Sequence, residues 1–404
     1  MVPEDWQVTK LGKVFKSRRE KGREGLPTIS VTLNDGLVLR ESLERRTETN
    51  LSPDEHLLVR AGDIAYNMMR MWQGASGRAR FDALVSPAYV VLKPTSEIDP
   101  VFASYFFKSR RMIYLFWAYS YGLTSDRLRL YYPDFSVIPV ALPSIEEQRR
   151  IAELLTTWDR AIETVGKLIS NGEERKHALM QQLLTGKRRL PGFHQPWTEK
   201  VLRSVGPFRK GKGLSRDHIA AGGVPCVLYG DLYTKYDNVV RSFTSFIPSE
   251  SASEGQLIRK GDLLYTVSGE TPEEIGKCVA YVGDEDAYAG GDILIQSPKH
   301  DDPEYLGYLM NHVSVVRQRT RFAQGHSIVH ISSANLGSIH LTVPEKAEQR
   351  AIAKVLSSAD RSVQNCVEER NALLSQKEAL MQQILSGKRR VKLDGAALPV
   401  AAIG

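Results

Sequence analysis

The chain has 404 residues, of which 42% are hydrophobic, so it is long enough for two or three domains with separate cores. Its formal net charge of +7 favours polyanionic partners, among which nucleic acid is the commonest in a cytoplasm. Three cysteines without CxxC spacing indicate neither a zinc site nor an oxidising compartment, so a cytoplasmic location is expected. The most apolar stretch is interrupted by basic residues, which excludes a membrane span there.

Residues 1–142 predict a mixed α/β domain, with a β-rich run at 86–94 and a helix from Pro100. Phosphate contacts are expected from the basic side chains of a loop that contains glycines. These residues are Lys16, Arg18, Arg19, Lys21 and Arg23. Two further loops mix planar donors with an aromatic ring, the chemistry that reads base edges in the major groove. Their candidate residues are Arg70, Trp72, Gln73, Arg127 and Arg129. An ordinary solvated surface is the alternative for each of these loops.

Residues 143–189 predict a long spacer helix that starts after a proline with acidic residues in its first turn. Its apolar residues alternate spacings of four and three, the pattern of a helix that pairs with another helix. A length of about 40 residues corresponds to roughly 60 Å at ~1.5 Å per residue. Asn171 and Gly172 interrupt the seam and predict a kink or short break. Lys176 falls on the seam, so looser or solvated pairing is expected there.

Residues 190–343 predict a second mixed α/β domain, because LIRKGDLLY (257–265) matches LVRAGDIAY (58–66) and a helix is again expected after a β-rich run, from Pro303. The corresponding basic loop offers Arg209, Lys210, Lys212 and Arg216 for phosphate contacts. The loop that corresponds to Arg127 and Arg129 offers His326, Ser327 and His330 instead. Different side chains in matching loops predict that the two domains read different sequences.

Residues 344–390 repeat the first spacer helix, and residues 391–404 are expected to form a C-terminal tail. Pro344 to Arg390 aligns without a gap to Pro143 to Arg189, 201 positions earlier, with about 20 identical residues. Lys377 repeats the seam position of Lys176. Two such helices can pair with each other, most simply antiparallel.

Polar residues recur at both ends of this repeat, where a merely solvated face has little reason to preserve them. A surface that docks two copies of one partner, or that contacts the DNA backbone, explains them better. The candidate partner-binding residues are Glu147, Gln148, Arg149, Lys187, Arg188, Arg189, Glu348, Gln349, Arg350, Lys388, Arg389 and Arg390.

The predicted fold class is therefore α+β: two mixed α/β domains separated by two long antiparallel helices that form a coiled coil, with an approximate internal two-fold axis. No P-loop, HExxH, GxSxG or GxGxxG is present, and no catalytic or metal-binding residue is predicted. The run Ser86-Pro87-Ala88-Tyr89 is interpreted as a strand entry. A solvated turn explains the carboxylates of Asp284, Glu285, Asp286 and Asp292.

The proline-led PSIEEQRRIA and PEKAEQRAIA, the helix ends LMQQLLTGKRRL and LMQQILSGKRRV, and the passage GKRRLPGFHQPW resemble the specificity subunit of type I restriction-modification systems. The resemblance covers essentially the whole chain. It implies a non-catalytic subunit whose two target-recognition domains each bind one half of a bipartite, asymmetric DNA site, while the helices fix the unread gap. Two modification subunits and a restriction subunit are the implied partners. S-adenosylmethionine, ATP and magnesium are expected on those subunits and not on this chain.

Two other classes of function stay open at this point: a stand-alone DNA-modifying or cleaving enzyme with an unrecognised site, and a coiled-coil adaptor. Methyl transfer or cutting by the purified chain with DNA, S-adenosylmethionine and magnesium indicates the enzyme. Binding without sequence preference indicates the adaptor, which leaves the matched basic loops unexplained.

Overall fold

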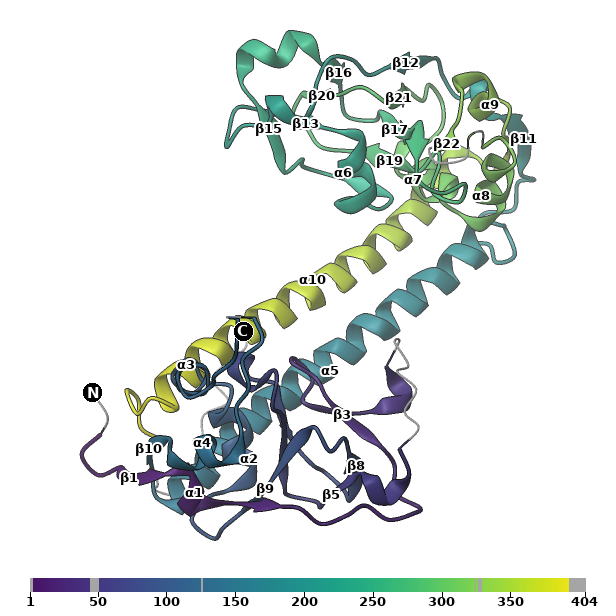
Figure 1. The fold of residues 1–404 in the computed structure, drawn as a ribbon. Coiled ribbons are helices and arrows are strands. Elements are labelled where there is room, and N and C mark those ends of the chain that lie inside the picture. Colours follow the sequence, from purple (N-terminus) through teal and green to yellow (C-terminus); the bar gives the residue numbers. More distant parts are fainter. Residues whose placement is uncertain (1–2, 44–50, 125, 324, 326–328, 392–404) are drawn as a thin grey trace. The chain divides into compact units, whose positions relative to one another are not determined.

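The computed structural model describes residues 3–43, 51–124, 126–323, 325 and 329–391. The chain divides into two compact units, Met1–Gly166 with Glu368–Gly404, and Lys167–Val367. Each unit combines one head with part of both long helices, α5 (Ile145–Leu183) and α10 (Lys346–Ile384) (Figure 1). The expected division into heads, helices and tail follows the sequence repeat and stays a prediction.

The first head is built on an antiparallel four-stranded sheet of order β2-β9-β6-β7, and β1 pairs with β10 to join its beginning to its end. Its strands are β1 (Gln7–Lys10), β2 (Phe15–Arg18), β3 (Ile29–Val31), β4 (Leu37–Leu39), β5 (Leu57–Val59), β6 (Ile64–Asn67), β7 (Ser76–Arg78), β8 (Ala83–Val85), β9 (Tyr89–Pro94) and β10 (Pro139–Leu142). Its helices are α1 (Leu11–Val14), α2 (Pro100–Phe106), α3 (Arg110–Ala118) and α4 (Tyr132–Val137), with short 3-10 helices η1 (Arg40–Ser42), η2 (Pro53–Glu55) and η3 (Met71–Gln73).

The second head has a sheet of order β12-β21-β17-β19-β14 and a four-stranded sheet of order β15-β13-β20-β16. Its strands are β11 (Thr198–Val201), β12 (Phe208–Lys210), β13 (Val224–Val227), β14 (Val239–Val240), β15 (Ser245–Ile247), β16 (Gln256–Ile258), β17 (Leu263–Thr266), β18 (Ser268–Gly269), β19 (Cys278–Tyr281), β20 (Ala287–Ala289), β21 (Ile293–Gln296), β22 (Val329–His330) and β23 (His340–Val343). Its helices are α6 (Tyr229–Thr234), α7 (Pro303–Met310), α8 (Val313–Thr320) and α9 (Ser333–Gly337), with 3-10 helices η4 (Leu202–Ser204), η5 (Arg216–His218) and η6 (Ser249–Glu254).

The two heads follow one plan. The pair β1-β10 corresponds to β11-β23, and the order β2-β9-β6-β7 recurs as β12-β21-β17-β19, to which the second head adds β14. The mixed α/β composition of both heads is confirmed, and the expected helices begin at Pro100 and Pro303, each with an aspartate as N-cap. The approximate two-fold relation between the units stays a prediction.

Both spacer helices are confirmed, each with 39 residues. The predicted break at Asn171 and Gly172 is wrong, since α5 is continuous through both residues. A Cβ on Gly172 would lie 2.8 Å from Cγ2 of Val363, so glycine serves the close approach of α10. Beyond the helix ends, Gly186 and Gly387 take positive φ angles of 69° and 75°, a conformation that favours glycine.

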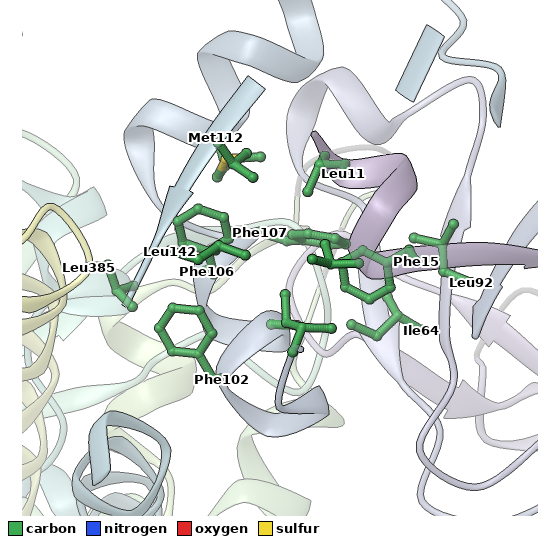
Figure 2. Close-up of a cluster of buried hydrophobic side chains, with 14 of the residues drawn as sticks. Leu11, Phe15, Ile64, Leu92, Phe102, Phe106, Phe107, Met112, Leu142 and Leu385 are labelled. Atoms are coloured by element: carbon green, nitrogen blue, oxygen red, sulfur yellow. The ribbon is translucent and has the colours of Figure 1, made fainter. Parts of the chain in front are cut away.

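The core of the first unit is shared between its head and the helices. Ile151 and Leu155 of α5 are buried in the same cluster as Ile384 and Leu385 at the end of α10. Figure 2 shows Leu385 together with Phe102 of the head in this cluster. In this unit the start of one helix therefore packs against the end of the other, as an antiparallel pair requires. The second unit repeats the arrangement, with Leu183, Leu184, Ile352 and Leu356 in one cluster.

Candidate nucleic-acid interface

The first head gathers the predicted base-reading residues at one groove of about 550 Å³. Its lining comprises Asn67, Met69, Arg70, Trp72, Gln73, Asp126, Arg127 and Arg129. All five sequence-predicted residues, from two loops more than fifty positions apart, are thus brought together. The backbone N–H of Leu130 donates to the carbonyl of Met68 at 2.9 Å, and this bond joins the two loops.

Local turns hold the groove side chains in place. Asn67 ends β6 and accepts the N–H of Met69 on its Oδ1 at 3.0 Å, and the indole Nε1 of Trp72 donates to the Met69 carbonyl at 3.0 Å. Gly74, at φ 91°, ends η3. Arg129 and Tyr121 bond through their backbones at 2.9 and 3.1 Å. The groove is therefore bordered by folded turns.

The groove presents hydrogen-bond donors to a ligand. Arg70 and Arg127 are exposed and have no ion-pair partner among the residues that the structure describes, whereas Arg129 donates to the Tyr131 hydroxyl at 3.3 Å. Guanidinium groups pair with guanine O6 and N7, and the side-chain amides of Asn67 and Gln73 pair with adenine. The arrangement suits the major-groove face of a DNA duplex.

The second head forms the same backbone link but carries other side chains. The N–H of Ile331 donates to the Val267 carbonyl at 3.1 Å, matching the Leu130–Met68 bond. His330 is exposed and its Nδ1 lies 3.0 Å from Oγ of Ser268. The predicted His326 and Ser327 lie outside the described residues. Matching positions therefore carry different donors in the two heads.

Two of the predicted phosphate-binding arginines have internal partners. Nε of Arg18 donates to Asp63 at 2.6 Å, and the side chain is only 9% exposed. Arg209 donates to Asp262 at 2.8 Å in the equivalent place. Each aspartate also accepts a backbone N–H in the turn before its strand, at 2.9 Å. Arg18 is therefore poorly placed for phosphate, whereas the paired side chain of Arg209 is still 38% exposed.

The other lysines and arginines predicted to contact phosphate are exposed. They are Lys16, Arg19, Lys21, Arg23, Lys210, Lys212 and Arg216. Arg23 has one distant ion pair with Asp82 at 3.8 Å, and Lys16 donates to the carbonyl of Gly12 at 2.9 Å. Exposed ammonium and guanidinium groups of this kind can contact phosphate.

Six of the twelve duplicated polar residues at the helix ends have partners inside their own unit, which the sequence interpretation did not foresee. Arg390 forms a two-bond pair with Glu147, at 2.8 and 2.7 Å, and also bonds Asp5. Arg189 forms the same pair with Glu348 at 2.6 and 2.7 Å. Both glutamates are buried. In each unit, one such pair therefore links the end of one long helix to the start of the other. The buried carboxylates are not available to a partner.

The neighbouring glutamines are also buried within their units. Gln148 donates to the carbonyl of Pro143 at 3.0 Å and Gln349 to that of Pro344 at 2.9 Å. The carboxylates beside Arg390 and Arg189 raise the pKa of both guanidinium groups, which stay charged at any physiological pH. Repetition of the two glutamines is therefore explained by their contacts inside each unit.

A second set of repeated residues is exposed in both units. It comprises the predicted Arg149, Lys187, Arg188, Arg350, Lys388 and Arg389, together with Arg160, Gln181, Gln182, Arg361, Gln382 and Gln383, which the sequence interpretation did not include. Identity between the two copies at positions off the apolar seam was the signal that could have found them. Arg149 and Arg160 lie eleven residues apart, about three helical turns, and so share one face of α5. We call this set the repeated surface.

The seam lysines are neutralised by partners, in contrast to the looser pairing expected for them. Lys176 pairs with Asp360 at 2.8 Å, and Lys377 pairs with Asp159. Their side chains are 19% and 17% exposed. Each pair joins α5 to α10 within one unit.

The acidic cluster of the second head behaves as a surface turn. Lys260 pairs with Asp284 at 2.6 Å, and Arg259 lies 3.7 Å from Asp286. Among the described residues, no group of three or more potential ligands could hold a metal ion. The run Ser86–Tyr89 forms the turn into β9, as expected.

The two heads share one fold and one pair of repeated helices but present different hydrogen-bond donors. This combination defines a protein that recognises a DNA sequence. The chain belongs to the family of type I restriction modification DNA specificity domains, whose model matches residues 3–170 and again residues 194–375. It is a DNA sequence specificity subunit of a type I restriction-modification system. Subunits of this kind are not catalytic, bind DNA and assemble with other subunits of the system.

Similar proteins span the whole chain. The type I restriction enzyme MjaVIII specificity subunit of Methanocaldococcus jannaschii is 24% identical over 97% of this chain and 94% of its own length. The putative MjaX specificity subunit of the same organism is 20% identical over 97% and 95%. Among the described helices, none is both long and apolar enough to cross a membrane.

Solved structures share the fold. The S subunit of a type I restriction-modification system from M. genitalium has a TM-score of 0.59 and 16% identity, over 95% of this chain and 96% of that one. A chain from a study of complex assembly and conformational transition of the type I system has a TM-score of 0.56 and 18% identity, over 96% and 100%.

Proposed function

We propose that each head reads one half of a bipartite, asymmetric DNA site and that α5 and α10 fix the unread gap between the halves. The groove that collects Arg70, Trp72, Gln73, Arg127 and Arg129 carries this proposal. It presents charged and amide donors, most of which have no side-chain partner within the described part of the chain. The second head offers different donors at the matching place, so its half-site differs.

A selection of bound sequences from a randomised duplex pool tests the proposal. The full chain, assembled with its modification subunits, is expected to select two dissimilar motifs at one constant spacing. Replacing the first head by that of a relative is expected to change one motif and leave the other. A single contiguous motif, or no motif, contradicts the proposal.

We propose further that two modification subunits dock on the repeated surface, one on each unit. The support is that Arg160 and Arg361, with their neighbours in the set, present the same exposed side chains twice. A restriction subunit joins this assembly, which acts on DNA in the cytoplasm. S-adenosylmethionine, ATP and magnesium belong to these partners in this proposal.

Native mass spectrometry of the assembled complex tests the docking. Arg160→Glu is expected to leave one modification subunit bound, and Arg160→Glu with Arg361→Glu to leave none, because charge reversal repels an acidic partner surface. Lys354→Glu, an exposed lysine of α10 outside the set, is the matched control. Two bound subunits in the double variant contradict the assignment.

A further inference from the structure

One three-residue cluster fastens the head of the first unit to both long helices. The hydroxyl of Tyr105, on α2, donates to Oδ2 of Asp159 on α5. Lys377 of α10 forms an ion pair with Oδ1 of the same carboxylate. Its Nζ also lies 5.2 Å from the centre of the Tyr105 ring, within the range of a cation–π contact. Asp159 therefore joins one head helix to both spacer helices.

The second unit contains the same cluster with the two long helices exchanged. Tyr308, on α7, donates to Oδ2 of Asp360 at 2.5 Å. Lys176 of α5 lies 2.8 Å from Oδ1 of Asp360. The aspartate now comes from α10 and the lysine from α5, as the repeat requires for antiparallel helices.

Both clusters are partly buried, although the side chains of Asp159 and Asp360 are 45% and 29% exposed. The lysine side chains are 17% and 19% exposed, and Tyr308 is fully buried. Burial, reinforced by the aspartate, raises the pKa of Tyr105 to about 12, and burial likewise raises that of Tyr308, so both hydroxyls keep their protons at neutral pH. Salt screens partly buried pairs of this kind less than it screens fully exposed pairs.

A second attachment holds the other end of each head helix. The backbone N–H of Asp99, the N-cap of α2, donates to Oε1 of Gln148 at 2.9 Å. The N–H of Asp302, the N-cap of α7, donates to Gln349 at 2.7 Å. In the first unit, Gln148 and Asp159 are eleven residues apart on α5, about 16 Å along one face. Two attachments so far apart fix the direction of a head as well as its position.

We propose that the clusters Tyr105–Asp159–Lys377 and Tyr308–Asp360–Lys176 are positioning elements that fix the direction of each head on its helix pair and thereby make DNA binding selective for the gap between half-sites. This inference rests on the proposed function. A gap longer by one base pair moves a half-site by about 3.4 Å and turns it by about 35° around the duplex. A head that cannot turn on its helices cannot follow that change.

Gap-dependent binding of the full chain, assembled with its modification subunits, tests the inference. The double variant Lys176→Met and Lys377→Met is expected to keep both half-site motifs. Its preference for the native gap over a gap one base pair longer or shorter is expected to fall about tenfold, because loss of the pairs frees the heads to turn. The double variant Lys176→Arg and Lys377→Arg is expected to keep the wild-type gap preference, since arginine also pairs with aspartate. Lys354→Met is the matched control.

An unchanged gap preference in the folded lysine variant overturns the inference and leaves the proposed function intact. Should that variant fail to fold, Tyr105→Phe with Tyr308→Phe removes only the two hydroxyls and is measured in the same way. An unchanged gap preference in the tyrosine variant then overturns the inference. A wild-type chain that selects two motifs without a constant gap refutes both the inference and the role of the helices.

Discussion

The first unit closes its helix end with Arg390 on Glu147, and the second unit makes the same pair from Arg189 and Glu348. Their recognition loops differ, because Arg70 and its neighbours line a groove in one head, whereas His330 is exposed at the place that matches Arg129 in the other. Contacts that need a particular internal partner have stayed the same in both units, whereas ligand-facing side chains have diverged. A residue repeated in such a chain therefore belongs either to the frame or to a surface used twice, and burial separates the two cases.

The largest effect is expected from breaking a repeated internal pair. Arg390→Met leaves the buried carboxylate of Glu147 without its main partner and is expected to cost about 3 kcal/mol of unfolding free energy. Arg189→Met should cost the second unit a similar amount. Denaturant unfolding measures both, with the exposed neighbours Arg389→Met and Arg188→Met as matched controls. Equal stability of Arg390→Met and its control contradicts the internal role.

A groove substitution is expected to sharpen the difference between the heads. Arg70→Ala should weaken discrimination at one or two positions of the first half-site by about 1–3 kcal/mol per lost contact and leave the second half-site unchanged. Sequence selection followed by competition binding measures this. Arg111→Ala, an exposed arginine on α3 of the same head, is the control. Loss at both half-sites would mean that the heads do not read independently.

Two glycines of α5 allow a comparison within one helix. Gly172→Ala places a Cβ 2.8 Å from Cγ2 of Val363 and is expected to destabilise the chain by about 1–2 kcal/mol. A Cβ at Gly166 meets nothing within 4 Å, so Gly166→Ala should gain up to about 1 kcal/mol from helix propensity. Denaturant unfolding of both variants checks the opposite signs. Stabilisation by both would exclude close packing at Gly172.

The smallest expected effect is a pH dependence of stability from one partly buried lysine of the first unit. Lys108 donates to the carbonyls of Leu33 and Gly74, and burial, which outweighs the charge of Asp35, lowers its pKa to about 8. Between about pH 8 and 10 the unfolded chain binds a proton that the folded chain has released, so this group makes stability rise with pH. Unfolding free energies from pH 7.5 to 9.5 should rise less in Lys108→Met than in the wild type. Equal slopes contradict the burial of this ammonium group.

The sequence predicted the frame better than the contacts inside it. The repeat gave both long helices and the two mixed heads, because apolar spacing and a duplicated segment are visible in a single sequence. The Arg390–Glu147 pair joins residues 243 positions apart in different copies of the repeat. Antiparallel pairing was expected to bring the start of one copy to the end of the other, but the alignment of the copies could not show which side chains meet there.

The candidate site was predicted in part. The residues of the first groove were found because arginine, glutamine and tryptophan in glycine-bounded loops have the donors that bases need. Arg18 and Arg209 look the same in sequence as their exposed neighbours, and only the fold shows that Asp63 and Asp262 engage them. Arg18 and Arg209 lie in strands β2 and β12, where successive side chains point to opposite faces of the sheet. The register of these short strands, which decides which basic side chain faces inward, was not predicted.

Exchange of the first head for that of a relative, with the helices left intact, tests the central claim most directly. The account predicts that the sequences selected by the assembled chimera differ in one half-site, with the other half-site and the gap between them unchanged. A change in both half-sites, or in the gap, would contradict two independent readers held by one repeated frame.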